Sequence, residues 1–230
     1  MTFTPSFGRP FSPSFKPNSN SLAEAGDGWW NLDGEIDICV GAWSPKGAAS
    51  SAMSLVDISG NGNDAEVLNA ITWDNTNGWT AGALSTGIAA NQTTSIIVRY
   101  SNRSVSTGAS VFGTNDNSPS RFKHTLYSAT AIYTYFGDKL AATGIDSGTG
   151  AAAVVALCGQ PSAGYKDYFN GTRKTNNTTA VFTVTNSEIL LRCSTTGNIP
   201  THNFLAAAVY KGSALTDTQV ASISSAMAAL

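Results

Sequence analysis

A run of alternating carboxylates and apolar residues, D-G-E-I-D-I at positions 33–38, has the residue types of a catalytic site. On an extended strand Glu35 and Asp37 would face the same side, because side chains alternate along a strand. A retaining glycosidase needs two carboxyl groups about 5–5.5 Å apart, one as nucleophile and one as acid/base. Glycoside hydrolysis that uses Glu35 and Asp37 is therefore a candidate activity.

The same segment resembles the E-I-D-I-x-E signature of laminarinase-type β-glucanases, which share the concanavalin A-like fold. The resemblance implies that the last glutamate supplies a catalytic carboxylate, but Val40 stands at that position here. Loss of a general acid/base group costs about 10²- to 10⁴-fold in rate. We therefore predict that the chain is not an enzyme. A glycoside hydrolase or glycan-binding module of this fold, using Glu35 and Asp37, is the alternative.

Oxygen-bearing side chains are concentrated at positions 57–64, D-I-S-G-N-G-N-D. Calcium, a hard cation, binds such oxygens. Its ligands here would be Asp57, Asn61, Asn63 and Asp64. Short Asp and Asn side chains also hold turns together by bonding to nearby backbone. We predict a structured loop and no cofactor, with calcium as the alternative.

Glycan binding needs aromatic platforms beside fixed polar groups. The candidate platforms are Trp73, Trp79, Tyr133 and Tyr135. The two tyrosines alternate with other residues in A-I-Y-T-Y-F, so they share one face of a strand. The alternative is that the tryptophans belong to the core and that the tyrosines form a packing or subunit surface.

The first twenty residues differ from the rest of the chain. Prolines alternate with phenylalanines at every fourth position, namely Phe3, Phe7, Phe11 and Phe15. Proline excludes an ordinary helix, so we expect an extended arm over residues 1–20, followed by a linker over 21–31. The arm either packs on its own domain or inserts into a partner or a neighbouring copy, and we predict that it anchors the protein.

Period-two patterns and turn signals predict about ten strands after the linker. The clearest hairpin spans residues 165–174 around Asn170 and Gly171, a type I′ turn pair. Thr216 and Gln219 form a capping box that begins a helix over 217–229, and its apolar stripe should cover an edge or an open end of the strands. The pattern indicates an all-β sandwich of jelly-roll type with one C-terminal helix.

Several motifs occur in a suggestive order: W-W at 29–30, P-K-G-A at 45–48, L-V-D-I-S-G-N-G-N-D at 55–64, G-W at 78–79 and A-L-T-D-T-Q-V-A at 214–221. This order resembles concanavalin A-like, laminin-G-like (LamG) domains of tailed-bacteriophage structural proteins. The resemblance implies a concanavalin A-like jelly-roll over residues 32–230. It also implies a virion role, as an outward-facing tail or capsid decoration or adhesion component.

The composition of the chain limits the classes of partner that we expect. Charged residues make up 12% of the chain and the net charge is −2, so we expect neither nucleic-acid binding nor membrane insertion. Cys39, Cys158 and Cys193 lie in apolar runs, which suggests buried free thiols. No signal peptide is evident, and together with free thiols this suggests synthesis in the host cytoplasm. We predict other virion proteins, a cell-surface glycan and further copies of the chain as partners. A trimer is an analogy with phage fibres.

Overall fold

The structure is a computed structural model. It describes residues 28–32, 38–102, 109–114, 121–126, 132–137, 139–143, 152–162, 164–179, 187–192 and 202–230. The strands of the first half are β1 (Cys39–Trp43), β2 (Glu66–Asp74), β3 (Gly78–Ala89), β4 (Ser95–Ser101), β5 (Ala109–Gly113), β6 (Arg121–Leu126) and β7 (Ile132–Gly137). Those of the second half are β8 (Lys139–Thr143), β9 (Ala153–Gly159), β10 (Tyr165–Phe169), β11 (Thr172–Asn177), β12 (Glu188–Leu191) and β13 (Asn203–Tyr210). The helices are α1 (Ser51–Ser54) and α2 (Asp217–Ala228).

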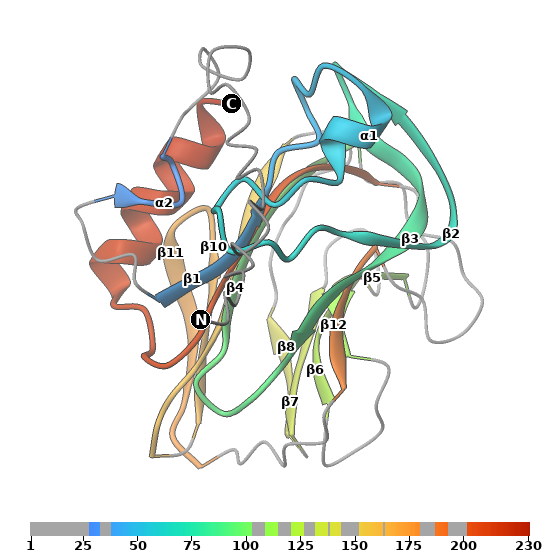
Figure 1. Cartoon of the computed structure of the whole chain (residues 1–230). Helices are drawn as coiled ribbons and strands as arrows, with labels where there is room; N and C mark the ends of the chain where they lie inside the picture. Colours follow the sequence, from blue (N-terminus) through green and yellow to red (C-terminus); the bar gives the residue numbers. More distant parts are fainter. Residues whose placement is uncertain are drawn as a thin grey trace, which may run out of the picture.

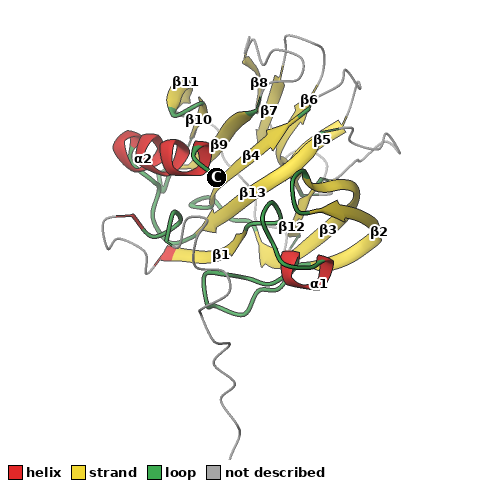
Figure 2. Ribbon diagram, turned by 90° about the horizontal axis from the view of Figure 1, so that it is seen from above, coloured by secondary structure: helices red, strands yellow, loops and turns green. Residues whose placement is uncertain are grey.

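The strands form one antiparallel sheet in the order β11-β10-β9-β4-β13-β3-β12-β5-β6-β7-β8. Strand β1 is added beside β13, and β2 is added beside β3. The sheet curls so that β8, at one end of the order, contacts β11, at the other end. Figure 1 shows β5 to β8 on the side of the molecule away from α2, and Figure 2 shows β2 beside β3. The predicted all-β sandwich with a C-terminal helix is confirmed. The predicted N-terminal arm lies outside the described residues.

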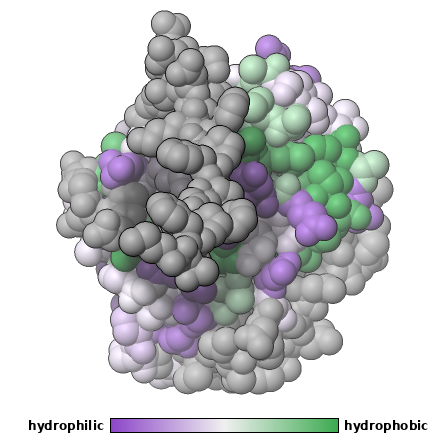
Figure 3. Space-filling model, in the orientation of Figure 1, coloured by the Kyte–Doolittle hydropathy of each residue, from purple (hydrophilic) through white to green (hydrophobic). Residues whose placement is uncertain are grey.

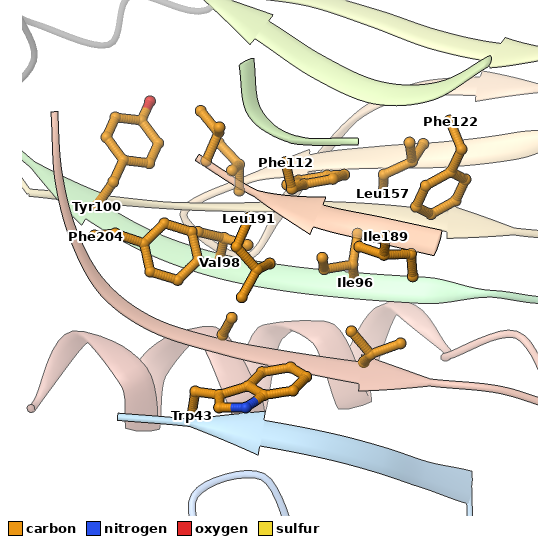
Figure 4. Packing of buried hydrophobic residues seen from close by; sticks show 14 of the residues in the cluster. Trp43, Ile96, Val98, Tyr100, Phe112, Phe122, Leu157, Ile189, Leu191 and Phe204 are labelled. Carbon is orange, nitrogen blue, oxygen red and sulfur yellow. The ribbon is translucent and has the colours of Figure 1, made fainter. Parts of the chain in front are cut away.

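The interior core fills the space inside the curl. It joins side chains of β4 and β9, such as Ile96, Val98 and Leu157, to aromatic side chains of β5 and β6, Phe112 and Phe122. Figure 4 shows these residues pointing toward one another between the strands. Burying each such side chain contributes about 1.5–3 kcal/mol. This core therefore holds the β5–β7 part of the sheet against the β4–β9 part.

A second core lies on the opposite face of β4, β9 and β13. In β9, Val155 and Leu157 belong to the interior core, whereas Val154, Ala156 and Cys158 belong to the second core. All seven residues of β9 are buried, because both faces of the strand are covered. This double burial explains why β9 reads as a continuous apolar run rather than as an alternating one.

Helix α2 covers the second core. Thr216 caps its first turn: the Thr216 hydroxyl accepts the backbone N–H of Gln219 at 3.2 Å, and the Gln219 side chain accepts the Thr216 N–H at 2.6 Å. Val220, Ile223 and Met227 are buried against the sheet. The capping box is confirmed. As expected, α2 lies against the sandwich: it covers the face of β9 and β4 and also contacts β11, the strand at one edge of the sheet.

The hairpin of β10 and β11 agrees with its turn sequence. Asn170 and Gly171 both have positive φ, 48° and 74°, as a type I′ turn requires. The Asn170 Oδ1 accepts the Val154 N–H at 2.9 Å, and the Asn170 N–H donates to the Val154 carbonyl at 2.7 Å. These bonds fix the turn to β9.

The hairpin of β2 and β3 was not predicted. The pairing of β2 with β3 has three register shifts, and the burial of β2 does not alternate. Val67 and Leu68 are 41% and 48% exposed, and Figure 3 shows a hydrophobic area over this part of the molecule. The short helix α1 was not predicted either. Neither helix in the described part of the chain is long and apolar enough to cross a membrane.

Candidate functional site

Two predicted platform residues share one face of β7. Tyr133 and Tyr135 are partly buried, whereas Thr134 and Phe136, the residues between and after them, are buried in the interior. The alternation places both phenol rings on the outer side of the sheet. We call Tyr133, Tyr135 and the neighbouring Lys123 of β6 the tyrosine face.

Lys123 is paired with Tyr135 by strand register. Its Nζ lies 5.2 Å from the centre of the Tyr135 ring, within the range of a cation–π interaction. On the other side Lys123 pairs with Gly113 of β5. A Cβ at position 113 would lie 2.2 Å from the Lys123 Cβ, so glycine leaves the space that the lysine side chain occupies.

Next to the tyrosine face, a hydrogen bond between two hydroxyl groups joins β5 to β6. Thr125 of β6 pairs in register with Tyr133 on one side and with Ser110 of β5 on the other. The Ser110 and Thr125 hydroxyl oxygens are 3.0 Å apart, and both residues are buried. The hydrogen bond links β5 to β6 and so supports the strand that carries Lys123.

A buried polar cluster lies directly behind the tyrosine face. Thr134 donates its hydroxyl hydrogen to Asp167 Oδ2 at 2.7 Å, across the interior from β7 to β10. His124 Nε2 lies 3.8 Å from the same oxygen, and His124, Thr134 and Asp167 have no exposed surface. Both His124 ring nitrogens and Asp167 Oδ1 have no hydrogen-bond partner among the described residues. The cluster holds the inner sides of β6 and β7 to β10.

The tryptophans lie elsewhere in the sheet. Trp79 is fully buried, stacks on Phe204 at 5.3 Å between ring centres, and donates its Nε1–H to the Ser54 hydroxyl at 2.9 Å. It therefore has no ring face at the surface. Trp73 is partly buried and donates its Nε1–H to the Pro45 carbonyl at 2.8 Å. Strands β12, β5 and β6 separate β3 from β7, so the tryptophans and tyrosines do not form one platform.

The loop at 57–64 is held by its own side chains. Asp57 Oδ1 accepts the N–H groups of Ala42 and Ser59, both at 2.9 Å. Asp57 Oδ2 accepts the Asn63 N–H at 3.0 Å, and Asp64 Oδ1 accepts the Asp57 N–H at 2.8 Å.

Two amides fasten this loop to β1. Asn61 donates to the Cys39 carbonyl at 2.8 Å and Asn63 donates to the Val40 carbonyl at 2.6 Å. In the described residues no three His, Cys, Asp or Glu side chains gather as metal ligands. The bonds account for the Asp and Asn residues as turn formers, and calcium stays an untested prediction.

Two sets of predicted site residues lie outside the described part of the chain. They are the phenylalanines of the arm, Phe3, Phe7, Phe11 and Phe15, and the carboxylates Glu35 and Asp37. Their predictions therefore remain open.

One buried residue that makes many hydrogen bonds, Arg192, was not predicted from the sequence. Arg192 follows β12 and is fully buried, with φ of 54°. Its guanidinium donates to the carbonyl oxygens of Trp79 at 2.7 Å, Thr80 at 2.8 Å, Gly82 at 3.3 Å and His202. Burial lowers the pKa of Arg192 to about 10. An arginine inside the apolar run L-L-R-C was the available signal.

No family model matches the sequence, and no curated protein matches it. Solved structures do share the fold. Domain 4 of AbnA, a GH43 extracellular arabinanase from Geobacillus stearothermophilus solved with arabinotriose, is 18% identical, with a TM-score of 0.60 over 81% of this chain and 98% of that chain. Trypanosoma rangeli sialidase with the inhibitor DANA is 16% identical, with a TM-score of 0.64 over 81% of this chain and 32% of that chain.

A third similar structure is that of botulinum neurotoxin type C, whose cell entry depends on two ganglioside molecules. It is 11% identical, with a TM-score of 0.60 over 83% of this chain and 51% of that chain. The chain thus spans about a third of the sialidase and half of the neurotoxin structure. At these identities the similarity establishes the fold alone.

Two predictions change with these comparisons. The prediction that the chain is not an enzyme is corrected, because the structures with its fold include sialidases and a domain of an arabinanase. The laminin-G resemblance gains no support, since no family model matches, and the comparisons do not support a role in a virion, tail or capsid. The sandwich fold is one found in proteins associated with sugars.

Proposed function

We propose that this chain is a glycan-binding β-sandwich and that the tyrosine face contacts the glycan. The observation that carries the proposal is the register of Tyr133, Tyr135 and Lys123, which brings two phenol rings and an ammonium group to one outer surface. Aromatic rings offer flat apolar surfaces to sugar rings, and the ammonium group can donate hydrogen bonds to hydroxyl or carboxylate oxygens. The similar sugar-associated structures support the same class of ligand.

The sheet fixes the spacing of the two tyrosine rings, which suits glycan binding. Rings on residues two apart along a strand lie roughly 7 Å from each other, and they are held at that spacing by the sheet. Thr134, between the two tyrosines, is bonded to Asp167 on the far side of the interior. The rings are therefore presented by a rigid strand, so binding costs little ordering of the protein.

The test is a glycan array probed with the full chain, followed by calorimetry with the strongest glycan. Arabinotriose and sialyllactose serve as neutral and acidic reference sugars. Tyr135→Ala should weaken binding about tenfold, which is about 1.4 kcal/mol. Lys123→Ala should weaken it about two- to fivefold, the size of one hydrogen bond or ionic contact to the glycan. Leu68→Ala, an exposed apolar change on β2, is the matched control. Unchanged affinity in Tyr133→Ala and Tyr135→Ala would exclude this surface.

We also propose that residues 1–20 anchor the chain to a larger particle, a role that rests on the sequence of the arm. Four phenylalanines spaced by four residues, with prolines between them, suit an extended segment that docks on another surface. A chain without residues 1–17 should keep its glycan affinity but lose attachment to the particle. Normal attachment of the shortened chain would refute the anchor and leave the glycan proposal untouched.

A further inference from the structure

Strand β2 has a free edge and an exposed apolar surface. It pairs with β3 on one side, and no strand in the described part of the chain pairs with it on the other side. Val67 and Leu68, which are neighbours on β2, are the exposed large apolar side chains among the described residues, at 41% and 48%. Figures 1 and 3, which share one orientation, place β2 at the side of the molecule where hydrophobic atoms gather. A further strand can add to an unpaired edge of this kind.

The pairing of β2 with β3 explains why two consecutive side chains are exposed. On a regular strand Val67 and Leu68 would face opposite sides of the sheet, and a covered face would bury one of them. The register shifts between Val67 and Asn69, so Leu68 is an extra residue in β2, and the register shifts again between Asn69 and Thr72. Regular stretches of β2 are therefore short, and a short partner strand suits the free edge better than a long one.

The arm contains two short units with the pattern F-x-P-x-F, at positions 3–7 and 11–15. In an extended segment the phenylalanines and the proline of a unit would share one face, and the Ser or Thr residues between them would share the other. Backbone N–H groups alternate between the two edges of a strand in the same way. The missing N–H of proline is tolerated in an edge strand where that side faces solvent. The Ser and Thr N–H groups of each unit can therefore all bond to one neighbouring strand.

The charges of the arm and of the region around β2 are complementary. Residues 1–20 contain one Arg, one Lys and no acidic residue. Residues 47–98, which include β2 and β3, contain four acidic residues and neither Lys nor Arg. Two of these acidic residues, Asp64 and Glu66, are exposed and lie next to Val67 in the sequence. Opposite charges of this kind attract the arm to β2 and favour it over an acidic segment.

We propose that β2 accepts the arm of a second copy of this chain, with one F-x-P-x-F unit along its free edge and the phenylalanine rings on Val67 and Leu68. The inference rests on the proposed anchoring role of the arm, which requires a surface outside the arm's own chain. It names that surface as β2 of a neighbouring copy. Copies then associate through their arms, and the exposed apolar side chains of β2 become covered.

The experiment is a complementation test with two full-length variants, followed by analytical ultracentrifugation. The arm variant carries Phe3→Ser, Phe7→Ser, Phe11→Ser and Phe15→Ser and keeps β2 intact. The β2 variant carries Val67→Lys and Leu68→Lys and keeps the arm intact. The natural chain should self-associate, and in each variant alone the dissociation constant should rise at least tenfold. A mixture of the two variants should form a complex of one copy of each, because the intact arm of one meets the intact β2 of the other.

A matched control and a check of folding complete the design. Ser213→Lys, an exposed change that adds the same charge away from β2, should associate like the natural chain. Circular dichroism should show that each variant keeps the β-sheet signal of the natural chain. Leu68→Gln, a milder polar change, should weaken association in the same direction as the double change.

Three results would overturn the proposal: a natural chain that stays monomeric, a β2 variant that associates like the natural chain, or a mixture that forms no complex. A monomeric natural chain is the result expected if the arm packs on its own domain. The anchoring role is judged separately, by attachment of the chain without residues 1–17 to the particle. Loss of attachment together with normal association of the β2 variant would reject β2 as the acceptor and leave the anchor standing.

Discussion

The imidazole of His124 lies 3.8 Å from the carboxylate of Asp167, and both side chains are completely buried between β6 and β10. Thr134 donates to the same carboxylate oxygen at 2.7 Å. This contact joins the strands that carry the tyrosine face to the opposite part of the sheet. Removal of one member leaves a buried polar group without its counterpart, which costs far more than removal of an exposed one.

We therefore expect Asp167→Ala to reduce the free energy of unfolding by about 3 kcal/mol, and Thr134→Val to reduce it by about 1 kcal/mol. Urea unfolding followed by tryptophan fluorescence measures both. Lys174→Ala, an exposed change on β11, should stay within about 0.5 kcal/mol of the natural chain. Equal stability of Asp167→Ala and Lys174→Ala would show that the cluster does not join the two parts of the sheet.

Arg192 offers a second stability test. Arg192→Met keeps the length of the side chain but removes the donors to four backbone carbonyls on β3 and at His202. Breaking a buried charged network of this kind should cost at least about 3 kcal/mol. The midpoint of urea denaturation gives the change, with Lys174→Met as the surface control. An unchanged midpoint would mean that these carbonyls find other partners.

The pH dependence of stability should include Asp217. The Tyr168 hydroxyl at 2.8 Å, followed by the Lys166 ammonium, holds the pKa of Asp217 below its ordinary value of 3.8. A carboxyl whose pKa is lowered on folding stabilises the protein above its unfolded pKa, and this contribution is lost as the pH falls through the folded pKa. Asp217→Asn should thus melt earlier at pH 7, and the difference should shrink as the pH falls below the ordinary pKa of 3.8. A constant difference across this window would contradict the assignment.

The two described thiols should be unreactive in the folded protein. Burial raises the pKa of Cys39 and of Cys158 to about 12 each. The thiolate is the reactive form, so both residues should resist alkylation at pH 8. Mass-spectrometric mapping of labelled peptides tests this without any substitution: neither cysteine should be modified in native buffer, and both should be modified in 6 M urea. Rapid native labelling of either would show that its strand opens.

Local signals in the sequence predicted the elements that local chemistry determines. The Asn170–Gly171 turn needs positive φ at both residues, and the capping box needs only Thr216 and Gln219. The buried free thiols at Cys39 and Cys158 followed from their apolar surroundings and are confirmed. In each case the determining residues are neighbours along the chain.

The pairing of strands that lie far apart along the chain could not be predicted from the sequence. The register shifts between β2 and β3 hide the alternation of β2, so the β2–β3 hairpin was not predicted. Lys123 reaches Tyr135 only because β6 and β7 pair in that register, with Gly113 of β5 making room. The burial of Trp79 against Phe204 likewise depends on β13, which lies far along the chain. The tyrosines were predicted to share a face, but their charged neighbour was not found.

The measurement that tests the glycan proposal most directly is the affinity of Tyr135→Ala for the strongest glycan on the array, determined by calorimetry beside the natural chain. The proposal predicts that Tyr135→Ala raises the Kd about tenfold and leaves the free energy of unfolding unchanged. Leu68→Ala should bind like the natural chain. Tyr135→Phe, which keeps the ring, should lose much less. Equal affinity of Tyr135→Ala and the natural chain, or no glycan bound by the natural chain at all, would contradict it.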